Sequence, residues 1–314
     1  MNQARAPSAK APARFSKMRR ADNIFLTLFA MPAVLLLFVF AYLPMGGLVL
    51  AFKDFTYDLG IFGSKWVGLS NFWIFNTVDA FRIIRNTVLY GFSLMGLSIV
   101  SSVILALLLF EVKSRKALKF YQTAYTIPNF MSWVIVSYIT YLFLSPTNGI
   151  ISSVVEFFGG ESVDLFSRLA PWPFILAIAS IWKGVGMNSI IYYAALMGTD
   201  YEMYEAARVD GAGRLKQAFY ISLPMLKPTI IILFILGLGN IMRGDFGLFY
   251  SVPRNVGLLY PVTDIIDTYI YRGLRNGNIG ATTAVGLVQS VVGCATVLSA
   301  NWAVKKISPE HALY

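Results

Sequence analysis

Cysteine, histidine and charged residues are all scarce in this chain of 314 residues. The only cysteine is Cys294 and the only histidine is His311. The chain therefore forms no internal disulfide, and it cannot build a histidine-based metal cage or a catalytic triad. Charged residues make up 13% of the sequence, whereas soluble domains have about 25%. These absences argue against a secreted disulfide-rich protein and against a soluble enzyme.

In place of charge, the chain has long hydrophobic runs. Hydrophobic residues make up 57% of it, and the mean hydropathy is +0.63. A helix needs about 20 apolar residues to cross a bilayer. The candidate spans are Ile24–Phe52, Asn86–Phe110, Phe120 to the charge at Glu156, Leu169–Met197, the segment from Lys227-Pro228 to Met242, and Ala281–Val304. We expect an all-α membrane protein with six transmembrane helices.

Basic residues predict how these spans are oriented. Most of the 26 Lys and Arg residues fall before residue 21, around 113–119, around 208–227, and after the last span. Because basic residues concentrate in cytoplasmic loops, both termini are expected in the cytoplasm. The formal net charge of +10 is then explained by an inner membrane surface rather than by nucleic acid. Residues 1–20 are expected to be a disordered basic cytoplasmic tail, 21–306 the transmembrane domain, and 307–314 a C-terminal tail.

Several kinds of membrane chemistry have no basis in the sequence. No GxxxxGK[ST] motif is present, so the chain does not cradle ATP phosphates itself. The second, third, fifth and sixth spans hold no carboxylate within them. This weakens an ion-coupled secondary carrier or a channel working alone, which stays the alternative. A membrane transferase would need clustered aspartates, and the nearest pair, Asp264 and Asp267, is better interpreted as a solvated helix face.

The loop between the fourth and fifth spans carries the most specific pattern. Thr199 followed by Glu202 predicts a capping box and a helix from about Asp200. Gly211 stands where a helix end favours positive φ, and a second short helix is expected from about Arg214 to Tyr220, ending before Pro224. The loop is thus expected to be a helix-turn-helix on the inner membrane face. It is either a docking surface or a plain amphipathic interfacial loop.

This loop resembles the signature of the permease subunits of ABC importers. The matching residues are Glu205, Ala206, Ala207, Gly211, Ile221, Leu223 and Pro224. Further likeness to the carbohydrate branch lies in Asn86-Thr87, in Ile181-Trp182-Lys183-Gly184, and in the segment from Asp264 to Arg272. Within that branch, Tyr42-Leu43-Pro44-Met45 and Ala51-Phe52-Lys53-Asp54 resemble the subgroup for complex oligosaccharides and polyuronates such as alginate.

The resemblance implies a multi-pass subunit in the bacterial cytoplasmic membrane that imports an oligosaccharide. Its partners would be a second permease that is expected to be a different chain, two ATP-binding cassette subunits that dock on residues 199–224, and an extracytoplasmic solute-binding protein. The chain itself would be no enzyme and would bind no cofactor or metal. ATP and Mg would be held by the ATPase subunits.

Inside the membrane, Lys183 is the residue of greatest interest. It follows Trp172 by 11 residues and so lies near mid-bilayer, where a lysine costs about 2.5–3.5 kcal/mol unless it faces water or a partner. Either it lines a substrate pathway with Trp182, Ser189 and Tyr193, or it bonds a carbonyl at a broken helix end. Asn240 and Arg243, near the outer end of the fifth span, are further candidates for the pathway.

Overall fold

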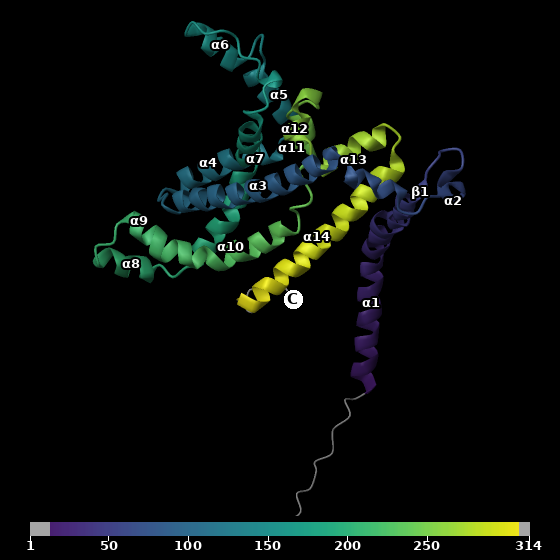
Figure 1. Ribbon diagram of the computed structural model, residues 1–314. Helices are drawn as coiled ribbons and strands as arrows, with labels where there is room; N and C mark the ends of the chain where they lie inside the picture. Colours follow the sequence, from purple (N-terminus) through teal and green to yellow (C-terminus); the bar gives the residue numbers. More distant parts are fainter. Residues whose placement is uncertain (1–12, 308–314) are drawn as a thin grey trace, which may run out of the picture.

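The computed structural model describes residues 13–307, and they form an almost entirely helical molecule (Figure 1). Five helical segments are long and apolar enough to cross a membrane, and a bent pair brings the number to six if it counts as one span. The expectation of a helical membrane protein is confirmed. The described residues add one antiparallel pair of two-residue strands, in which Lys53 faces Trp66 and Asp54 faces Lys65.

The elements follow one another in this order: α1 Ala13–Leu37, η1 Phe38–Tyr42, η2 Leu43–Phe52, β1 Lys53–Asp54, α2 Gly60–Gly63, β2 Lys65–Trp66, η3 Ser70–Asn76, α3 Val78–Phe110, α4 Arg115–Thr126, η4 Ile127–Phe130, α5 Trp133–Leu144, α6 Ile150–Phe157, η5 Leu165–Ser167, α7 Trp172–Met197, α8 Glu202–Val209, α9 Arg214–Gln217, η6 Ala218–Ser222, α10 Leu223–Leu238, α11 Phe246–Ser251, η7 Gly257–Leu259, α12 Tyr260–Thr263, α13 Ile266–Arg275 and α14 Ile279–Ile307.

Helix α7 organises the core because both of its ends are buried against other elements. Near its start, Trp172 and Leu176 are fully buried in a cluster with residues of α5 and α11. Near its end, Tyr192 and Leu196 pack against α3 and α10. Apolar contacts of this kind fix the position of a helix within a bundle, so α7 connects the two ends of the molecule.

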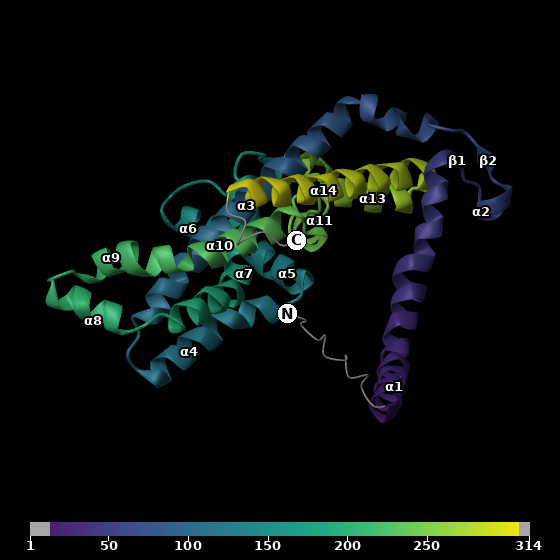
Figure 2. The ribbon, with the colours of Figure 1, turned by 90° about the horizontal axis from the view of Figure 1, so that it is seen from below.

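The first span stands apart from the bundle. Helix α1 projects away from the other helices in both views (Figures 1 and 2), and none of the most apolar window of Ile24–Phe52 is buried inside the chain. Its upper part, η2, packs against α14. The predicted disordered tail is only partly described: residues 13–20 are helical, contrary to expectation, and residues 1–12 lie outside the described residues.

The third predicted span is broken rather than straight. Helices α4 and α5 meet at an angle of 99° across a short break that follows η4. Pro128 lies in this η4 turn, and the hydroxyl of Ser132 accepts the amide of Ile135 to start α5. An uncharged run does not reveal such a bend, because helix breaks depend on proline and capping residues rather than on hydropathy.

The fifth span begins earlier and ends earlier than expected. One helical path runs from Arg214 to Leu238 and passes through Pro224 and Pro228. The expected stop before Pro224 is wrong, because the π-type turn η6 precedes the proline and accommodates its missing donor. After Leu238 the chain leaves helical geometry until Phe246. We call residues 239–245 the unwound segment.

Candidate coupling hairpin and membrane cavity

Helices α8 and α9 form a hairpin at one end of the molecule, far from α13 (Figures 1 and 2). We call residues 202–217 the terminal hairpin. Its first helix begins at Glu202, two residues later than predicted, and the carboxylate of Asp200 accepts the amide of Glu202 at 3.1 Å. The predicted capping role of Thr199 is therefore wrong. The Thr199 hydroxyl is buried without a hydrogen-bond partner.

Gly211 closes the first helix of the hairpin in the predicted way. Its φ is +77°, a conformation that costs residues with a Cβ atom about 1–2 kcal/mol. The amide of Ala212 donates to the carbonyl of Ala207 at 2.8 Å, and the amide of Gly211 donates to that of Arg208 at 3.0 Å. These two bonds form a Schellman motif. The prediction of positive φ at Gly211 is confirmed.

The hairpin has one anchored face and one free face. On the anchored face, the buried Tyr204 hydroxyl lies 2.9 Å from the hydroxyl of Ser222, and the Tyr204 ring packs against Phe110. On the free face, Glu205 and Ala206 are exposed and Ala207 is half-buried. A short alanine-bearing surface on a rigidly held helix suits close approach by another protein.

The remaining residues of the predicted signature lie where the hairpin joins α10. Ile221 and Leu223 are half-buried and Pro224 is exposed. Ile221 belongs to the π-type turn, while Leu223 and Pro224 open α10. They do not end a separate short helix, as was expected. Instead, the hairpin continues directly into the fifth span.

A partly polar cavity of about 490 Å³ lies among α3, α7 and the unwound segment. Helix α3 contributes Thr87, Tyr90 and Ser98 to its wall, and α7 contributes Ser180 and Asn188. The unwound segment contributes Asn240, Arg243 and Asp245. The side chain of Asn188 donates to the Ser98 hydroxyl at 3.1 Å, so the two walls are joined. Hydroxyl, amide and charged groups of this kind can hydrogen-bond a sugar.

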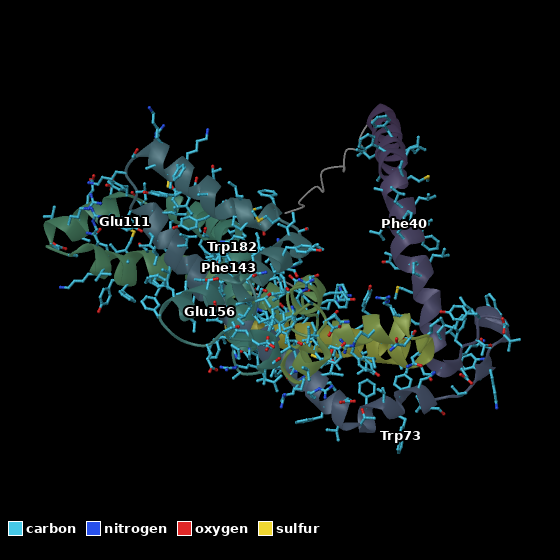
Figure 3. The ribbon with its side chains drawn as sticks, turned by 90° about the horizontal axis from the view of Figure 1, so that it is seen from above. Phe40, Trp73, Glu111, Phe143, Glu156 and Trp182 are labelled. Atoms are coloured by element: carbon cyan, nitrogen blue, oxygen red, sulfur yellow. The ribbon has the colours of Figure 1, made fainter. Side chains whose placement is uncertain are left out.

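The predicted pathway residues divide into two groups. Asn240 and Arg243 line the cavity, whereas Trp182, Lys183, Ser189 and Tyr193 do not. Trp182, labelled in Figure 3, is exposed. Ser189 is buried and donates to the carbonyl of Gly186. Tyr193 packs into the α3–α7–α10 cluster.

The cavity is also lined by residues that were not predicted from the sequence. Ser180 and Asn188 lie eight residues apart on α7, with Gly184 midway. Residues at spacings of four and eight share a helix face, so this small and polar stripe was a usable signal. The position of Asp245 on the cavity wall could not be predicted from the sequence, because it depends on where α10 ends.

Lys183 holds a broken helix end in place. Its ammonium donates to the carbonyl of Asn129 at 2.7 Å and lies 5.3 Å from the ring centroid of Trp133. The Trp133 indole in turn donates to Asp245 at 2.9 Å. Of the two interpretations of Lys183, this geometry supports the bond to a carbonyl.

The unwound segment is fixed from behind by two side chains. Gln289 of α14 donates to the carbonyl of Met242 at 2.6 Å, and Asp267 of α13 accepts the amide of Gly244 at 2.7 Å. Burial raises the pKa of Asp267, while the Gly244 amide opposes that shift. These contacts set the position of Arg243 at the cavity wall.

Asp264 and Asp267 are not on the solvated helix face that was expected. Asp264 is 2% exposed and forms an ion pair of 2.6 Å with Arg272, and it also accepts the Thr268 hydroxyl at 2.7 Å. Because both carboxylates are engaged within the fold, they support no catalytic aspartate cluster.

Helices that are long and apolar enough to cross a membrane, a partly polar cavity among them and a hairpin at one end are together consistent with a membrane permease. The chain belongs to the family of binding-protein-dependent transport system inner membrane components, whose family model matches residues 98–309. This places it among the permease subunits of ABC importers, as the loop signature had predicted, rather than among carriers that work alone.

Several similar proteins are named for the transport of sugar polymers or oligosaccharides. The chain is 37% identical to YteP of Bacillus subtilis, a polygalacturonan/rhamnogalacturonan transport system permease protein, over 91% of this chain and 89% of that one. It is 28% identical to the arabinooligosaccharides transport system permease protein AraP of Halalkalibacterium halodurans, over 72% of each chain. A crystal structure of a bacterial ABC transporter involved in the import of the acidic polysaccharide alginate matches with a TM-score of 0.81. That chain is 32% identical, and the match covers 94% of this chain and 99% of that one.

Proposed function

We propose that this permease imports an acidic oligosaccharide across the bacterial cytoplasmic membrane, driven by ATP hydrolysis on partner subunits. The observation that carries the proposal is the terminal hairpin, anchored to the body through Tyr204 and Ser222 and exposed at Glu205 and Ala206. An ATPase subunit docks on this face. ATP and Mg²⁺ bind that partner, and this chain contributes motion rather than chemistry.

Helix α10 connects the hairpin to the cavity. Its 16 residues, Leu223–Leu238, span about 24 Å at 1.5 Å per residue. A shift of α8 reaches α10 through the bond between Tyr204 and Ser222 and through the π-type turn. The far end of α10 leads into the unwound segment that carries Arg243. Movement of the hairpin therefore displaces the cavity wall.

The preference for an acidic substrate is supported by Arg243 and by the relatives. Arg243 lies on the cavity wall and is exposed, and a guanidinium binds a carboxylate through a two-pronged hydrogen bond. Two of the similar proteins are named for the transport of polygalacturonan/rhamnogalacturonan and for the import of alginate. Asn188, Ser180 and Tyr90 would then bind sugar hydroxyls.

The remaining assembly follows from the family. A second permease subunit completes the pathway and is a different chain. An extracytoplasmic binding protein delivers the sugar. A similar alginate transporter has been crystallised with an alginate pentasaccharide-bound periplasmic protein. Both termini and the terminal hairpin lie on the cytoplasmic side, in keeping with the basic residues around them.

The substitution Gly211→Asp tests the coupling role. It places a residue with a Cβ atom at φ +77° and should distort the turn. We expect the complex to assemble but to lose the stimulation of ATP hydrolysis by sugar-loaded binding protein. Gly213→Asp is the matched control, because Gly213 has a φ of −68° and open space around it. Full stimulation in Gly211→Asp, or equal loss in both variants, would contradict the proposal.

A further inference from the structure

Arg254 adopts a backbone conformation that usually belongs to glycine. Helix α11 ends in a Schellman motif: the amide of Asn255 donates to the carbonyl of Tyr250 at 3.1 Å, and the amide of Arg254 donates to that of Ser251 at 3.0 Å. Arg254 thus takes the position after α11 that Gly211 takes after α8, and its φ is +57°. A side chain is disfavoured at this position. Strain of this kind concentrates at functional sites, so the arginine needs an explanation.

The guanidinium of Arg254 lies on two tyrosine rings of α5 and has no polar partner. Its central carbon is 4.2 Å from the ring centroid of Tyr141 and 5.8 Å from that of Tyr138. Arg254 and Tyr138 are exposed. Within residues 13–307, no carboxylate lies within 4 Å of this guanidinium. Stacking holds the plane of the group, while its five N–H donors stay available to a planar anion.

Helices α5 and α11, which lie side by side (Figure 1), connect Arg254 to the cavity wall. At the inner end of this pair, the Trp133 indole donates to Asp245, which lines the cavity. One turn further along α5, the Ser137 hydroxyl donates to a carbonyl at the end of α11 at 2.6 Å. After another turn, Tyr141 lies against Arg254. Eight residues of helix span about 12 Å, so Arg254 stands about that far beyond the Trp133 contact, on the same face of α5.

We propose that Arg254 binds a carboxylate of the incoming oligosaccharide, as an outer binding point ahead of Arg243 at the cavity wall. The proposal rests on the acidic substrate and on the orientation proposed above, in which α5 leads toward the extracytoplasmic side. The guanidinium forms a two-pronged hydrogen bond with the carboxylate. The exposed ring of Tyr138 offers an apolar surface to the sugar ring beside it. Two arginines along one path select a chain that carries more than one carboxylate.

The test is uptake into proteoliposomes that contain the complete transport complex, with binding protein loaded with each sugar. The probes are an oligouronate of five residues and a neutral oligosaccharide of the same length. Arg254→Gln and Arg254→Gly should each reduce uptake of the oligouronate roughly fivefold and leave that of the neutral sugar unchanged. Glycine adopts positive φ without strain, so Arg254→Gly should assemble and melt no lower than the unmodified chain. Arg254→Lys keeps the charge but loses the fork, and should cause a smaller loss.

Arg275→Gln is the matched control. Arg275 lies in the last turn of α13, is exposed, and forms no ion pair within the described part of the chain. Its replacement removes the same charge and should leave uptake of both sugars unchanged. Equal loss in Arg275→Gln and Arg254→Gln would overturn the binding point in favour of general attraction.

Three further outcomes are informative. Equal loss of acidic and neutral uptake in Arg254→Gly would overturn the binding point in favour of a contact with the binding protein or with lipid. A selective loss of oligouronate uptake in Arg243→Gln, with none in the Arg254 variants, would overturn the outer binding point and leave the proposed function standing. An unmodified complex that prefers the neutral sugar would refute the acidic substrate, and the binding point with it.

Discussion

Lys183 and Arg243 are two cations in or beside the spans, and their surroundings give them different tasks. The Lys183 ammonium donates to the carbonyl of Asn129, in the turn between α4 and α5. The Asn129 carbonyl receives no hydrogen bond from a helical amide. The Lys183 ammonium and this carbonyl therefore satisfy each other, in a region where unpaired polar groups are costly. Arg243 instead faces the cavity.

This difference makes a paired prediction. Lys183→Met should reduce the uptake of an oligouronate and of a neutral oligosaccharide to the same extent, because it loosens the break between α4 and α5. Arg243→Gln should reduce uptake of the oligouronate about tenfold and that of the neutral sugar far less, because it removes a charge-assisted hydrogen bond. Radiolabelled uptake into proteoliposomes measures both. A selective effect in Lys183→Met would return this residue to the substrate pathway.

At the scale of residues, the sequence predicted which groups a side chain would bond better than it predicted which helix face lines the cavity. A carbonyl partner was one of the two alternatives for Lys183, and the structure has such a partner. Asn240 and Arg243 line the cavity, and their place on a substrate pathway stays a prediction. Ser189 and Tyr193 were predicted on the pathway because they share a helix face with Trp182, yet none of the three lines the cavity. A helical wheel gives the relative angles of residues, but it does not say which face of the helix meets a cavity.

Two helix breaks determine the architecture at the scale of elements. The break between α4 and α5 lies against α7 at Gly186, where an added Cβ atom would stand 1.9 Å from the carbonyl oxygen of Tyr125. The unwound segment lies against the α5 end of that break through the bond between Trp133 and Asp245. The two breaks are therefore joined by a side-chain hydrogen bond.

The close approach at Gly186 gives a prediction for stability. Gly186→Ala should push α4 away from α7 and cost roughly 1–3 kcal/mol, as overpacking does. Gly184→Ala, two residues earlier in the same helix, meets no atom closer than 3.6 Å, and should be neutral or stabilising because alanine favours helix. Thermal unfolding of the purified chain in detergent compares the two. Equal melting temperatures would contradict the tight contact.

Element boundaries were predicted unevenly, for physical reasons. Helix α7 fell close to its predicted position, whereas α3 ends at Phe110 as predicted but begins at Val78, eight residues before the predicted Asn86. The third and fifth spans did not match their predicted course, because hydropathy is blind to a bend within apolar sequence and because a proline after a π-type turn does not end a helix. Gly211 was predictable because positive φ strongly selects glycine.

At the scale of the whole molecule, the first span is the least integrated part of the chain. Its most apolar window buries nothing within the chain, and Phe40 lies on this isolated helix (Figure 3) with 75% of its surface exposed. Leu176, in the core around α7, is fully buried. Packing within this chain therefore depends on Leu176 and not on Phe40.

The contrast predicts two different outcomes for one kind of truncation. Phe40→Ala should leave the stability of the isolated subunit unchanged within about 0.5 kcal/mol. Leu176→Ala should lower it by about 2–5 kcal/mol, because it opens a cavity in a packed core. Melting temperatures of the two purified variants in the same detergent decide this. A large loss in Phe40→Ala would show that the first span packs against the bundle of its own chain.

The turn at Gly211 restricts the chirality of the residue at this position rather than the size of its side chain. No atom lies within 4 Å of the position that a Cβ would occupy there, yet φ is +77°. Side-chain volume is therefore no obstacle, and only the stereochemistry of the L-amino acid disfavours a replacement. A D-alanine introduced by protein semisynthesis would adopt this conformation without strain, whereas L-alanine would not. The turn between α8 and α9 is thus a place where a mirror-image residue should serve as well as the natural one.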